Sequence, residues 1–414
     1  MNPIRHRLQK FYRAVVPFEW RIAFRDWRRV RGAARRPTSA YVDELRAIVA
    51  AAPAARGVIA FPPGFGWTTG LFQRPHHLAH ELARLGYIVL FMDYTERGAA
   101  TGFQQVEDQL YIAVLPSGVQ RAVFGVLDRA VVLTTTYQYP HLSVFRDPIL
   151  IYDVLDHLAV FTELHPLESL KKWHADLLQR ADMVVCTSDI LLRETHALRA
   201  DAILCPNGVN IDHFAQFGAP PDAMRPILAE GKPIIGYYGT LARWVDYDLI
   251  RQSAAALPDC NFVLIGPDAD GTFAESGLRS LDNVRWIDVV PYSDLPAYLV
   301  CFDVATIPFV VSDLTAAVSP VKLFEYMAGA RPIVSMSLPE CRKYPVVAVA
   351  ESAEEYIRLL RRALTLRPDR DHAAALLATA RDNTWAARAA VIAAAIVHAS
   401  NGAARTSNVQ RARA

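Results

Sequence analysis

Short apolar segments alternate with amphipathic ones along most of this 414-residue chain, and this alternation restricts the folds open to it. Strands that alternate with helices form a parallel sheet covered by helices on both faces. In such α/β sheets, functional residues lie at the carboxyl ends of the strands. A chain of this length is expected to form two domains, each with its own core. The segments typical of buried strands are residues 57–61, 87–92, 110–115, 130–133, 148–152, 182–187, 233–241, 261–267, 283–287 and 303–309.

The composition indicates a globular protein of the reducing cytoplasm. Hydrophobic residues make up 52% of the chain, and the mean hydropathy is +0.13. We expect no transmembrane helix, because no uncharged apolar run reaches the required length of about 18 residues, and no signal peptide. The cysteines lack CxxC spacing and no cluster resembles a metal site, so we expect reduced thiols, no metal and no cofactor. The cysteines are Cys186, Cys205, Cys260, Cys301 and Cys341.

The first 36 residues form a basic segment. They contain eleven Lys or Arg residues and two acidic ones, a net charge of +9 in a chain that totals +2. Trp20, Phe24 and Trp27 recur at helical spacing beside a face of arginines. Such a helix suits an anionic membrane surface, although it could instead pack on the protein's own body. No nucleic-acid module follows, so we expect no nucleic acid and instead a peripheral protein at the inner face of the cell membrane.

A helix is predicted to begin at Ser319 and Pro320, after the strand at 303–309. Ser319 suits the N-cap, Pro320 the first turn. The first backbone N–H groups of the helix, from Val321 to Leu323, would then favour an anion such as a phosphate, and Lys322 adds a positive charge. Glu325 shares a face with Lys322 and can accept two hydrogen bonds from the cis-diol of a ribose. The alternative is an ordinary helix with a surface Lys–Glu pair.

The sequence from Ser319 to Val334, Ser-Pro-Val-Lys-Leu-Phe-Glu-Tyr-Met-Ala-Gly-Ala-Arg-Pro-Ile-Val, resembles the donor-site signature of the group 1 glycosyltransferases, in particular a bacterial polysaccharide subgroup. Further similarities lie at residues 73–79, 152–156, 206–214 and 244–247. The resemblance implies an α/β protein of GT-B architecture, with two Rossmann-like doubly wound domains facing across a cleft. It implies that the helix start and Lys322 hold a nucleotide diphosphate and that Glu325 binds the ribose.

The resemblance also implies two further groups of residues. The loop at Gly239 would face the donor phosphates, with Arg243 as the basic residue after it; the alternative for Arg243 is an ordinary exposed side chain. On the first domain, the acceptor would meet His76 and a loop that contains Gly64, Phe65, Gly66 and Trp67. His76 is equally well explained as a residue on a helix surface.

Asp153 and Asp156 follow the strand at 148–152 and are the candidate catalytic residues. A carboxylate at this strand end could act as a base toward an acceptor hydroxyl or hold the acceptor in place. The alternative is that both carboxylates cap the next helix.

Two positions depart from the family pattern. Ala317 stands where typical retaining members carry a second Glu, eight residues before Glu325. The family's Ala-Ala-Gly-Lys-Pro appears here as Ala-Gly-Ala-Arg-Pro, so Ala330 would be strained if that position needs a positive φ. A retaining outcome therefore rests on the resemblance alone.

The expected organisation is a basic segment at 1–40, an acceptor domain at 41–208, a donor domain at 209–383, a helix at 384–400 that returns to the first domain, and a disordered tail at 401–414. The expected function is metal-independent transfer of a sugar from a nucleotide-diphosphate sugar to a hydroxyl of a glycan or polyprenyl-linked acceptor. Cell-surface polysaccharide synthesis is the expected context. The alternatives are a nucleotide-sugar 2-epimerase and an inactive membrane-associated assembly partner.

Overall fold

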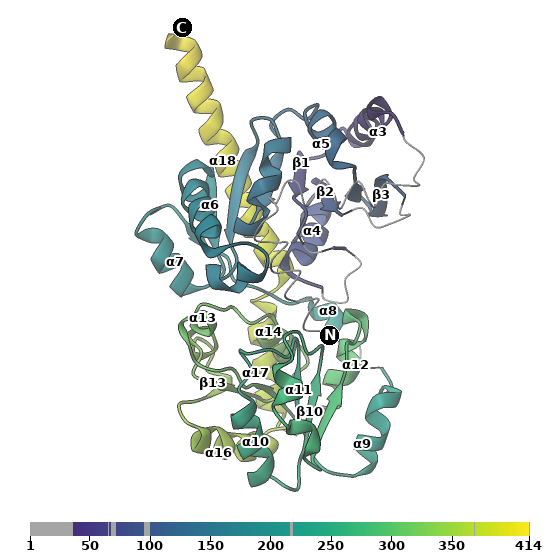
Figure 1. Cartoon of the computed structure of the whole chain (residues 1–414), viewed down its shortest axis with the longest axis vertical. Helices are drawn as coiled ribbons and strands as arrows, with labels where there is room; N and C mark the ends of the chain where they lie inside the picture. Colours follow the sequence, from purple (N-terminus) through teal and green to yellow (C-terminus); the bar gives the residue numbers. More distant parts are fainter. Residues whose placement is uncertain are drawn as a thin grey trace.

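The computed structural model describes residues 36–64, 66–67, 72–94, 100–215, 218–367 and 369–413, with the backbone alone for 402–413. The described residues form two α/β domains stacked end to end (Figure 1). The basic segment that we expect to meet a membrane lies outside them, apart from Arg36. No helix within the described ranges is long and apolar enough to span a membrane.

The first domain is built on an eight-stranded sheet in the order β3-β4-β2-β1-β5-β6-β7-β8. Neighbouring strands are parallel except for β3 and β4. Its strands are β1 (Val58–Phe61), β2 (Ile88–Asp93), β3 (Gly102–Glu107), β4 (Leu110–Val114), β5 (Val131–Thr134), β6 (Ile149–Val154), β7 (Met183–Cys186) and β8 (Ile203–Leu204). Its helices are α3 (Thr38–Ala51), α4 (Arg74–Arg84), α5 (Ser117–Phe124), η1 (Thr136–Val144), η2 (Leu158–Glu163), α6 (Leu167–Arg180) and α7 (Asp189–His196).

The second domain contains a six-stranded parallel sheet in the order β11-β10-β9-β12-β13-β14. Renumbered within the domain this is 3-2-1-4-5-6, the order of a Rossmann fold. Its strands are β9 (Ile234–Tyr238), β10 (Asn261–Ile265), β11 (Val284–Ile287), β12 (Val304–Ile307), β13 (Ile333–Met336) and β14 (Val347–Ala350). Its longer helices are α10 (Tyr247–Ala256), α14 (Val321–Ala328), α16 (Ala353–Leu364) and α17 (Arg370–Arg381), and its shorter ones include α8 (Ile211–Phe214), η5 (Tyr292–Asp294), α13 (Asp313–Ala316) and α15 (Pro339–Arg342).

The chain crosses between the domains twice, and the two crossings are hydrogen-bonded to each other. The N–H of Val209 donates to the carbonyl of Asn383, and the N–H of Trp385 donates to the carbonyl of Val209, both at 3.0 Å. After the second crossing, α18 (Trp385–Arg413) packs against α4 and the strands β6 and β7 of the first domain (Figure 1). Trp385, at the start of α18, is 1% exposed and belongs to the core of that domain.

Two expected boundaries differ from the structure. The tail at 401–414 was predicted to be disordered, but α18 continues without a break to Arg413. This stretch contains no proline, and its single glycine, Gly402, costs a helix only about 1 kcal/mol relative to alanine. Residues 38–40, which we placed in the basic segment at 1–40, form the first turn of α3.

Candidate functional site

A cavity of about 400 Å³ lies between the two domains, at the carboxyl ends of β6, β9 and β12. This is the expected place for a ligand in doubly wound sheets. The first domain contributes Phe72, Gln73, Arg74, Pro75, Leu155, Asp156, Val160 and Phe161, and Asn207 lies at the crossing. The second domain contributes residues that include Tyr238, Gly239, Trp244, Tyr292, Phe309, Leu314, Ser319, Val321, Lys322 and Glu325.

The donor helix α14 begins one residue later than the sequence predicted. Pro320 is the N-cap, and no side chain caps the helix. The hydroxyl of Ser319 instead accepts a hydrogen bond from the N–H of Asn207 at 3.2 Å, and its carbonyl accepts one from Asn207 Nδ2 at 2.6 Å. Ser319 therefore connects the start of α14 to the crossing between the domains instead of capping the helix.

Four of the five residues predicted around the start of α14 line the cavity: Ser319, Val321, Lys322 and Glu325. The first N–H groups of a helix have no partner within it, so this end of α14 presents donors to the cavity. Leu323 is the exception, because its side chain is 0% exposed in the core and its N–H donates to the carbonyl of Pro320 at 3.1 Å. The assignment of Leu323 to the donor site was wrong.

Lys322 and Glu325 face the cavity without an ion-pair partner among the described residues. The Lys322 ammonium lies 5.0 Å from the ring centre of Phe309 and 5.4 Å from that of Tyr237. Burial lowers the pKa of Lys322 to about 8, although the nearby Glu325 opposes the shift. Burial raises the pKa of Glu325, which is 4% exposed, to about 7, against the effects of Tyr238 and Lys322. Both side chains are thus held in an apolar environment that disfavours their charged forms, and a charged or polar ligand in the cavity would stabilise those forms.

Gly239 lines the cavity directly after β9, where it was predicted. Its φ is +135°, a conformation that favours glycine, and an added Cβ would lie 2.9 Å from Cε of Lys322. A side chain here would push the lysine out of position. The glycine therefore allows the β9 loop and the donor helix to approach each other closely.

Arg243 does not reach the cavity. Its side chain is exposed, and its backbone N–H donates to Asp270 Oδ2 at 3.0 Å. The chain turns away from the cavity after Thr240, because Leu241 pairs with Asp268 in an isolated bridge. Trp244 occupies the cavity wall instead. The prediction for Arg243 was wrong, and Lys322 is the charged amine on this wall.

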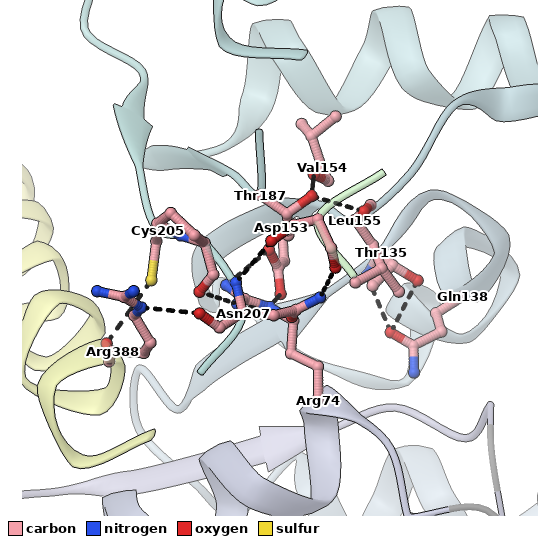
Figure 2. Close-up of polar contacts among 12 residues, drawn as sticks. Arg74, Thr135, Gln138, Asp153, Val154, Leu155, Thr187, Cys205, Asn207 and Arg388 are labelled. Atoms are coloured by element: carbon pink, nitrogen blue, oxygen red, sulfur yellow. Dashed lines mark hydrogen bonds and ion pairs between the residues drawn. The ribbon is translucent and has the colours of Figure 1, made fainter. Parts of the chain in front are cut away.

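Asp156 lies two residues beyond β6 and lines the cavity, as a functional residue at a strand end should. Its Oδ1 atom is buried and has no hydrogen-bond partner among the described residues. Burial raises its pKa to about 7. The preceding carbonyl, of Leu155, accepts a hydrogen bond from the Thr187 hydroxyl at 2.7 Å, which fixes the backbone before Asp156 (Figure 2).

Asp153 is not a free base, because it forms a buried ion pair with Arg74. Arg74 Nε lies 2.7 Å from Asp153 Oδ2, and Arg74 Nη2 lies 3.2 Å from Asp153 Oδ1 (Figure 2). The two residues are 2% and 3% exposed. Asp153 does not line the cavity, so its prediction as a catalytic residue was wrong. Arg74 was not among the predicted site residues, although its position directly before Pro75, at the start of a helix, could have indicated it.

The part of the predicted acceptor loop that the structure describes does not line the cavity. His76 is 0% exposed and caps α4 through an acceptor Nδ1, 3.0 Å from the N–H of Gln73. Trp67 packs on His76 with ring centres 5.4 Å apart. An added Cβ at Gly64 would lie 2.8 Å from the ring of Tyr137. Gly64, Gly66, Trp67 and His76 therefore have structural roles here, which corrects their assignment to acceptor binding, and Phe65 lies outside the described residues.

Tyr292, the first residue of η5, joins the two domains. Its ring stacks on Phe72 of the first domain at 5.2 Å and on His213 at 4.5 Å between centres. Its hydroxyl is buried without a hydrogen-bond partner among the described residues, and burial raises its pKa. Tyr292 thus gives the cavity an aromatic wall and an unused polar atom.

Within the described residues, no three His, Cys, Asp or Glu side chains gather into a possible metal site. The five cysteines are free and buried. The polar groups that line the cavity include the helix start, Lys322, Glu325, Asp156 and the unpartnered hydroxyls of Tyr238 and Tyr292.

Comparison with known proteins connects this geometry to a family. Residues 232–366, most of the second domain, match the family model described as glycosyl transferases group 1. This part of the chain is similar to the group 1 glycosyltransferases. A stretch of 191 residues is 32% identical to TuaH of Bacillus subtilis (strain 168), a protein named as a glycosyltransferase of teichuronic acid biosynthesis. The match covers 45% of this chain and 48% of TuaH, so the chain spans about half the length of this curated relative.

Solved structures show that the whole fold is that of the GT-B glycosyltransferases. Sucrose-phosphate synthase from Thermosynechococcus elongatus has a TM-score of 0.62 at 15% identity, covering 82% of this chain and 98% of its own. HepE from Anabaena, in complex with UDP-glucose, has a TM-score of 0.61 at 15% identity, covering 82% and 99%. The prediction of a GT-B architecture is confirmed, and the family match to residues 232–366 supports the predicted resemblance of the donor domain to the group 1 family.

Proposed function

We propose that the protein transfers a sugar from a nucleotide-diphosphate sugar to a hydroxyl group of an acceptor. The observation that carries the proposal is the pair formed by Lys322, which is half-buried, and Glu325, which is buried; both line the cavity without ion-pair partners among the described residues. A diphosphate beside Lys322 and the first N–H groups of α14 would supply the missing negative charge. The ribose diol would supply hydrogen-bond donors to Glu325.

In the proposed reaction, the acceptor oxygen bonds to the anomeric carbon of the donor sugar. The bond between that carbon and the diphosphate oxygen breaks, and its electron pair leaves with the nucleoside diphosphate. The hydroxyl proton passes to the Asp156 carboxylate, whose pKa of about 7 suits a base near neutral pH. Gly239 allows the β9 loop to close on the diphosphate, and catalysis rests on positioning and charge stabilisation.

Two finer features belong to the proposal. Lys322 and the helix start neutralise the departing diphosphate, so we expect turnover without added divalent metal and no loss in a chelator. Retention of the anomeric configuration is proposed from the family alone. Ala317, where retaining members carry a Glu, is 1% exposed and packs with the core of the first domain. It therefore offers no polar group to the sugar.

The biological setting that we propose is cell-surface polysaccharide synthesis, at the inner face of the membrane. Its support is the similarity to TuaH, named for teichuronic acid biosynthesis, together with the basic segment at 1–36. Deletion of residues 1–36 should move the protein from the membrane pellet to the supernatant. An unchanged distribution would contradict the membrane contact.

A thermal-shift screen against UDP-, GDP-, dTDP- and CMP-sugars tests the donor site. A ligand at about 100 times its Kd stabilises a protein by about 2.7 kcal/mol. One nucleotide should raise the Tm of the wild type, and Lys322→Ala and Glu325→Ala should abolish the rise. Lys232→Ala is the matched control, because Lys232 is exposed and does not line the cavity.

The second candidate function is an inactive assembly partner, which is favoured by Ala317 alone. Such a protein could bind a nucleotide sugar but would neither hydrolyse nor transfer it. Product release measured with the nucleotide sugar that shifts the Tm separates the two functions. Turnover that Glu325→Ala removes would exclude the inactive partner, and binding without turnover would favour it.

A further inference from the structure

The first-domain wall of the cavity differs in chemistry from the donor wall that faces it. It consists mainly of apolar side chains from the start of α4 and the residues just before it, from the segment after β6, and from η2, namely Phe72, Pro75, Leu155, Val160 and Phe161. Its charged members are Arg74 and Asp156. The acceptor must lie against this wall if the donor occupies the other, so the state of these two charges decides what kind of acceptor fits.

Arg74 has little left to offer a ligand. Its Nε and Nη2 atoms bond to the carboxylate of Asp153 (Figure 2). Its Nη1 atom donates to the carbonyl of Pro206 at 2.9 Å and to Asn207 Oδ1 at 3.4 Å. A phosphate that drew the guanidinium away would leave Asp153 charged and unpaired in the protein interior. Arg74 thus lines the cavity but does not act as an anion site.

Asp156 has the opposite character, because its carboxyl group is left free for a ligand. Its Oδ1 atom is buried and has no hydrogen-bond partner among the described residues. A neutral hydroxyl can donate a hydrogen bond to this oxygen, whereas a phosphate would meet the ionised carboxylate as a like charge, and the guanidinium of Arg74 is already bonded to Asp153. The unpaired carboxylate therefore selects for a hydroxyl donor and against an anion.

The apolar part of the wall is held in place from behind. The ring of Phe161, which is 5% exposed, packs on Tyr137 with centres 4.9 Å apart, and Leu170 completes this cluster. The carbonyl of Leu155 is fixed by Thr187. A mostly apolar wall with few polar groups is typical of ligand sites, in which the polar groups fix the orientation of the ligand. A sugar ring combines an apolar C–H face with hydroxyl donors and fits this wall.

We propose that the acceptor is a neutral saccharide and that the protein extends an existing sugar rather than starting a chain on a lipid phosphate. This inference rests on the proposed glycosyl transfer and narrows its acceptor. The sugar ring lies on the wall around Phe161, and its hydroxyl donates to Asp156. Any charged carrier to which the saccharide is linked remains outside the cavity. A separate reaction must then supply the saccharide, by attaching a first sugar to a carrier.

The test uses the full-length protein and the nucleotide sugar that shifts its Tm. One set of reactions contains a panel of neutral octyl glycosides, and the other contains farnesyl phosphate, a soluble prenyl monophosphate. We expect product with at least one glycoside and none with farnesyl phosphate. Asp156→Asn should lower kcat with the glycoside by about 100-fold, the scale of a lost general base, and leave the donor Kd within about twofold. Asp313→Asn is the control, because this exposed carboxylate lies beside the cavity residue Leu314 but not in the wall.

The outcomes separate this inference from the proposed function. Transfer to farnesyl phosphate would overturn the inference and leave the proposed function intact. Donor hydrolysis without transfer to any glycoside would also count against the inference. No donor binding and no hydrolysis would instead contradict the proposed function. A loss in Asp156→Asn that appears equally in the donor Kd would show that Asp156 does not act on the acceptor.

Discussion

The two walls of the interdomain cavity hold their charges in opposite ways. On the donor wall, Glu325 is buried and Lys322 half-buried, and neither has an ion-pair partner among the described residues. On the acceptor wall, Arg74 is buried but bonded to Asp153, which is buried as well and does not line the cavity. A buried charge that the protein itself neutralises serves the fold, whereas a buried charge left unneutralised serves a ligand. Asp156 is thus the residue on the acceptor wall that corresponds to Lys322 and Glu325 on the donor wall, because its carboxyl group is left free for a ligand.

The largest expected effect is on the acceptor wall. Arg74→Ala leaves Asp153 charged, buried and unpaired, so the free energy of unfolding should fall by about 3–5 kcal/mol. Urea denaturation followed by circular dichroism measures the change. Arg46→Ala is the control, because Arg46 pairs with Asp43 on the surface at 3.6 Å and should cost less than about 1 kcal/mol. An equal decrease in the free energy of unfolding in the two variants would mean that the buried ion pair does not stabilise the fold more than a surface pair does.

Glu325→Gln should change stability in the opposite direction. The pKa of Glu325 is about 7 in the folded protein, whereas the ordinary pKa of a glutamate, 4.5, applies in the unfolded chain. Ionisation of Glu325 therefore opposes folding once the pH exceeds the pKa in the unfolded chain. The penalty grows between these two values and is complete above the higher one. The variant should therefore gain about 1–3 kcal/mol at about pH 8 and almost nothing at about pH 4, while losing the donor.

Glu340→Gln is the matched comparison for this prediction. Glu340 is 2% exposed, but Lys343 lies 2.8 Å from its carboxylate and the N–H of Asp189 donates to it at 3.0 Å. Its substitution should lower the free energy of unfolding, because a satisfied carboxylate is removed. If the free energy of unfolding changed in the same direction in Glu325→Gln and Glu340→Gln, the distinction between the unpaired Glu325 and the paired Glu340 would be contradicted. Thermal unfolding at the two pH values supplies both results.

Donor affinity should follow a bell-shaped pH profile, because the free protein must carry a charged Lys322 and an ionised Glu325. The pKa of Lys322 is about 8 and that of Glu325 about 7, so affinity should peak between these values. Because the two groups interact, the two limbs belong to the pair. Affinity should fall by about tenfold for each pH unit beyond either limb, which is about 1.4 kcal/mol. Titration calorimetry with the nucleotide sugar measures the profile.

Lys322→Arg separates the two limbs of this profile. The guanidinium stays charged at every accessible pH, so the alkaline limb should disappear and the acidic limb should remain. An unchanged alkaline limb would assign that limb to a group other than Lys322.

Most of the donor wall could be predicted from the sequence because each of its parts is marked by a local pattern. Lys322 and Glu325 are three residues apart on one helix, and Gly239 follows a strand with a strongly apolar pattern. Local apolar patterns also predicted ten strands, and the family resemblance implied the GT-B fold. The acceptor wall depends on contacts that no local pattern reports. Arg74 and Asp153 are separated by 79 residues, and their pairing removes Asp153 from the candidate bases.

The strands that sequence reasoning omitted are β3, β8, β13 and β14. Residues 104–106 of β3 are exposed, so this antiparallel edge strand has no apolar run to reveal it. β8 contains only two residues, and β13 and β14 contain four each. Arg243 failed for a related reason, because the direction of the chain after Thr240 is set by a bridge between Leu241 and Asp268. Long-range pairing decided each of these cases.

The smallest expected effect concerns the end of the donor helix. Ala330 adopts a φ of 52°, the left-handed conformation that the family's glycine would favour at this position. Its N–H donates to the carbonyl of Met327 at 3.0 Å, so the strained conformation closes the end of α14. The left-handed conformation costs an alanine about 1–2 kcal/mol, and a glycine would not incur this cost. Part of the resulting gain in stability is offset, because a glycine has a larger conformational entropy in the unfolded chain. Ala330→Gly should therefore raise the free energy of unfolding by about 0.5–1 kcal/mol.

The preceding residue explains why the glycine stands one position early, and it supplies the contrasting variant. Gly329 has a φ of −78°, which any residue can adopt, but an added Cβ would lie 2.4 Å from Cδ2 of Leu299. Gly329 is thus required by packing and Ala330 is tolerated despite its backbone. Gly329→Ala should destabilise the protein while Ala330→Gly stabilises it, and thermal unfolding of both should show Tm shifts of opposite sign. Destabilisation by Ala330→Gly would mean that the methyl group of Ala330 contributes more to packing than its conformation costs.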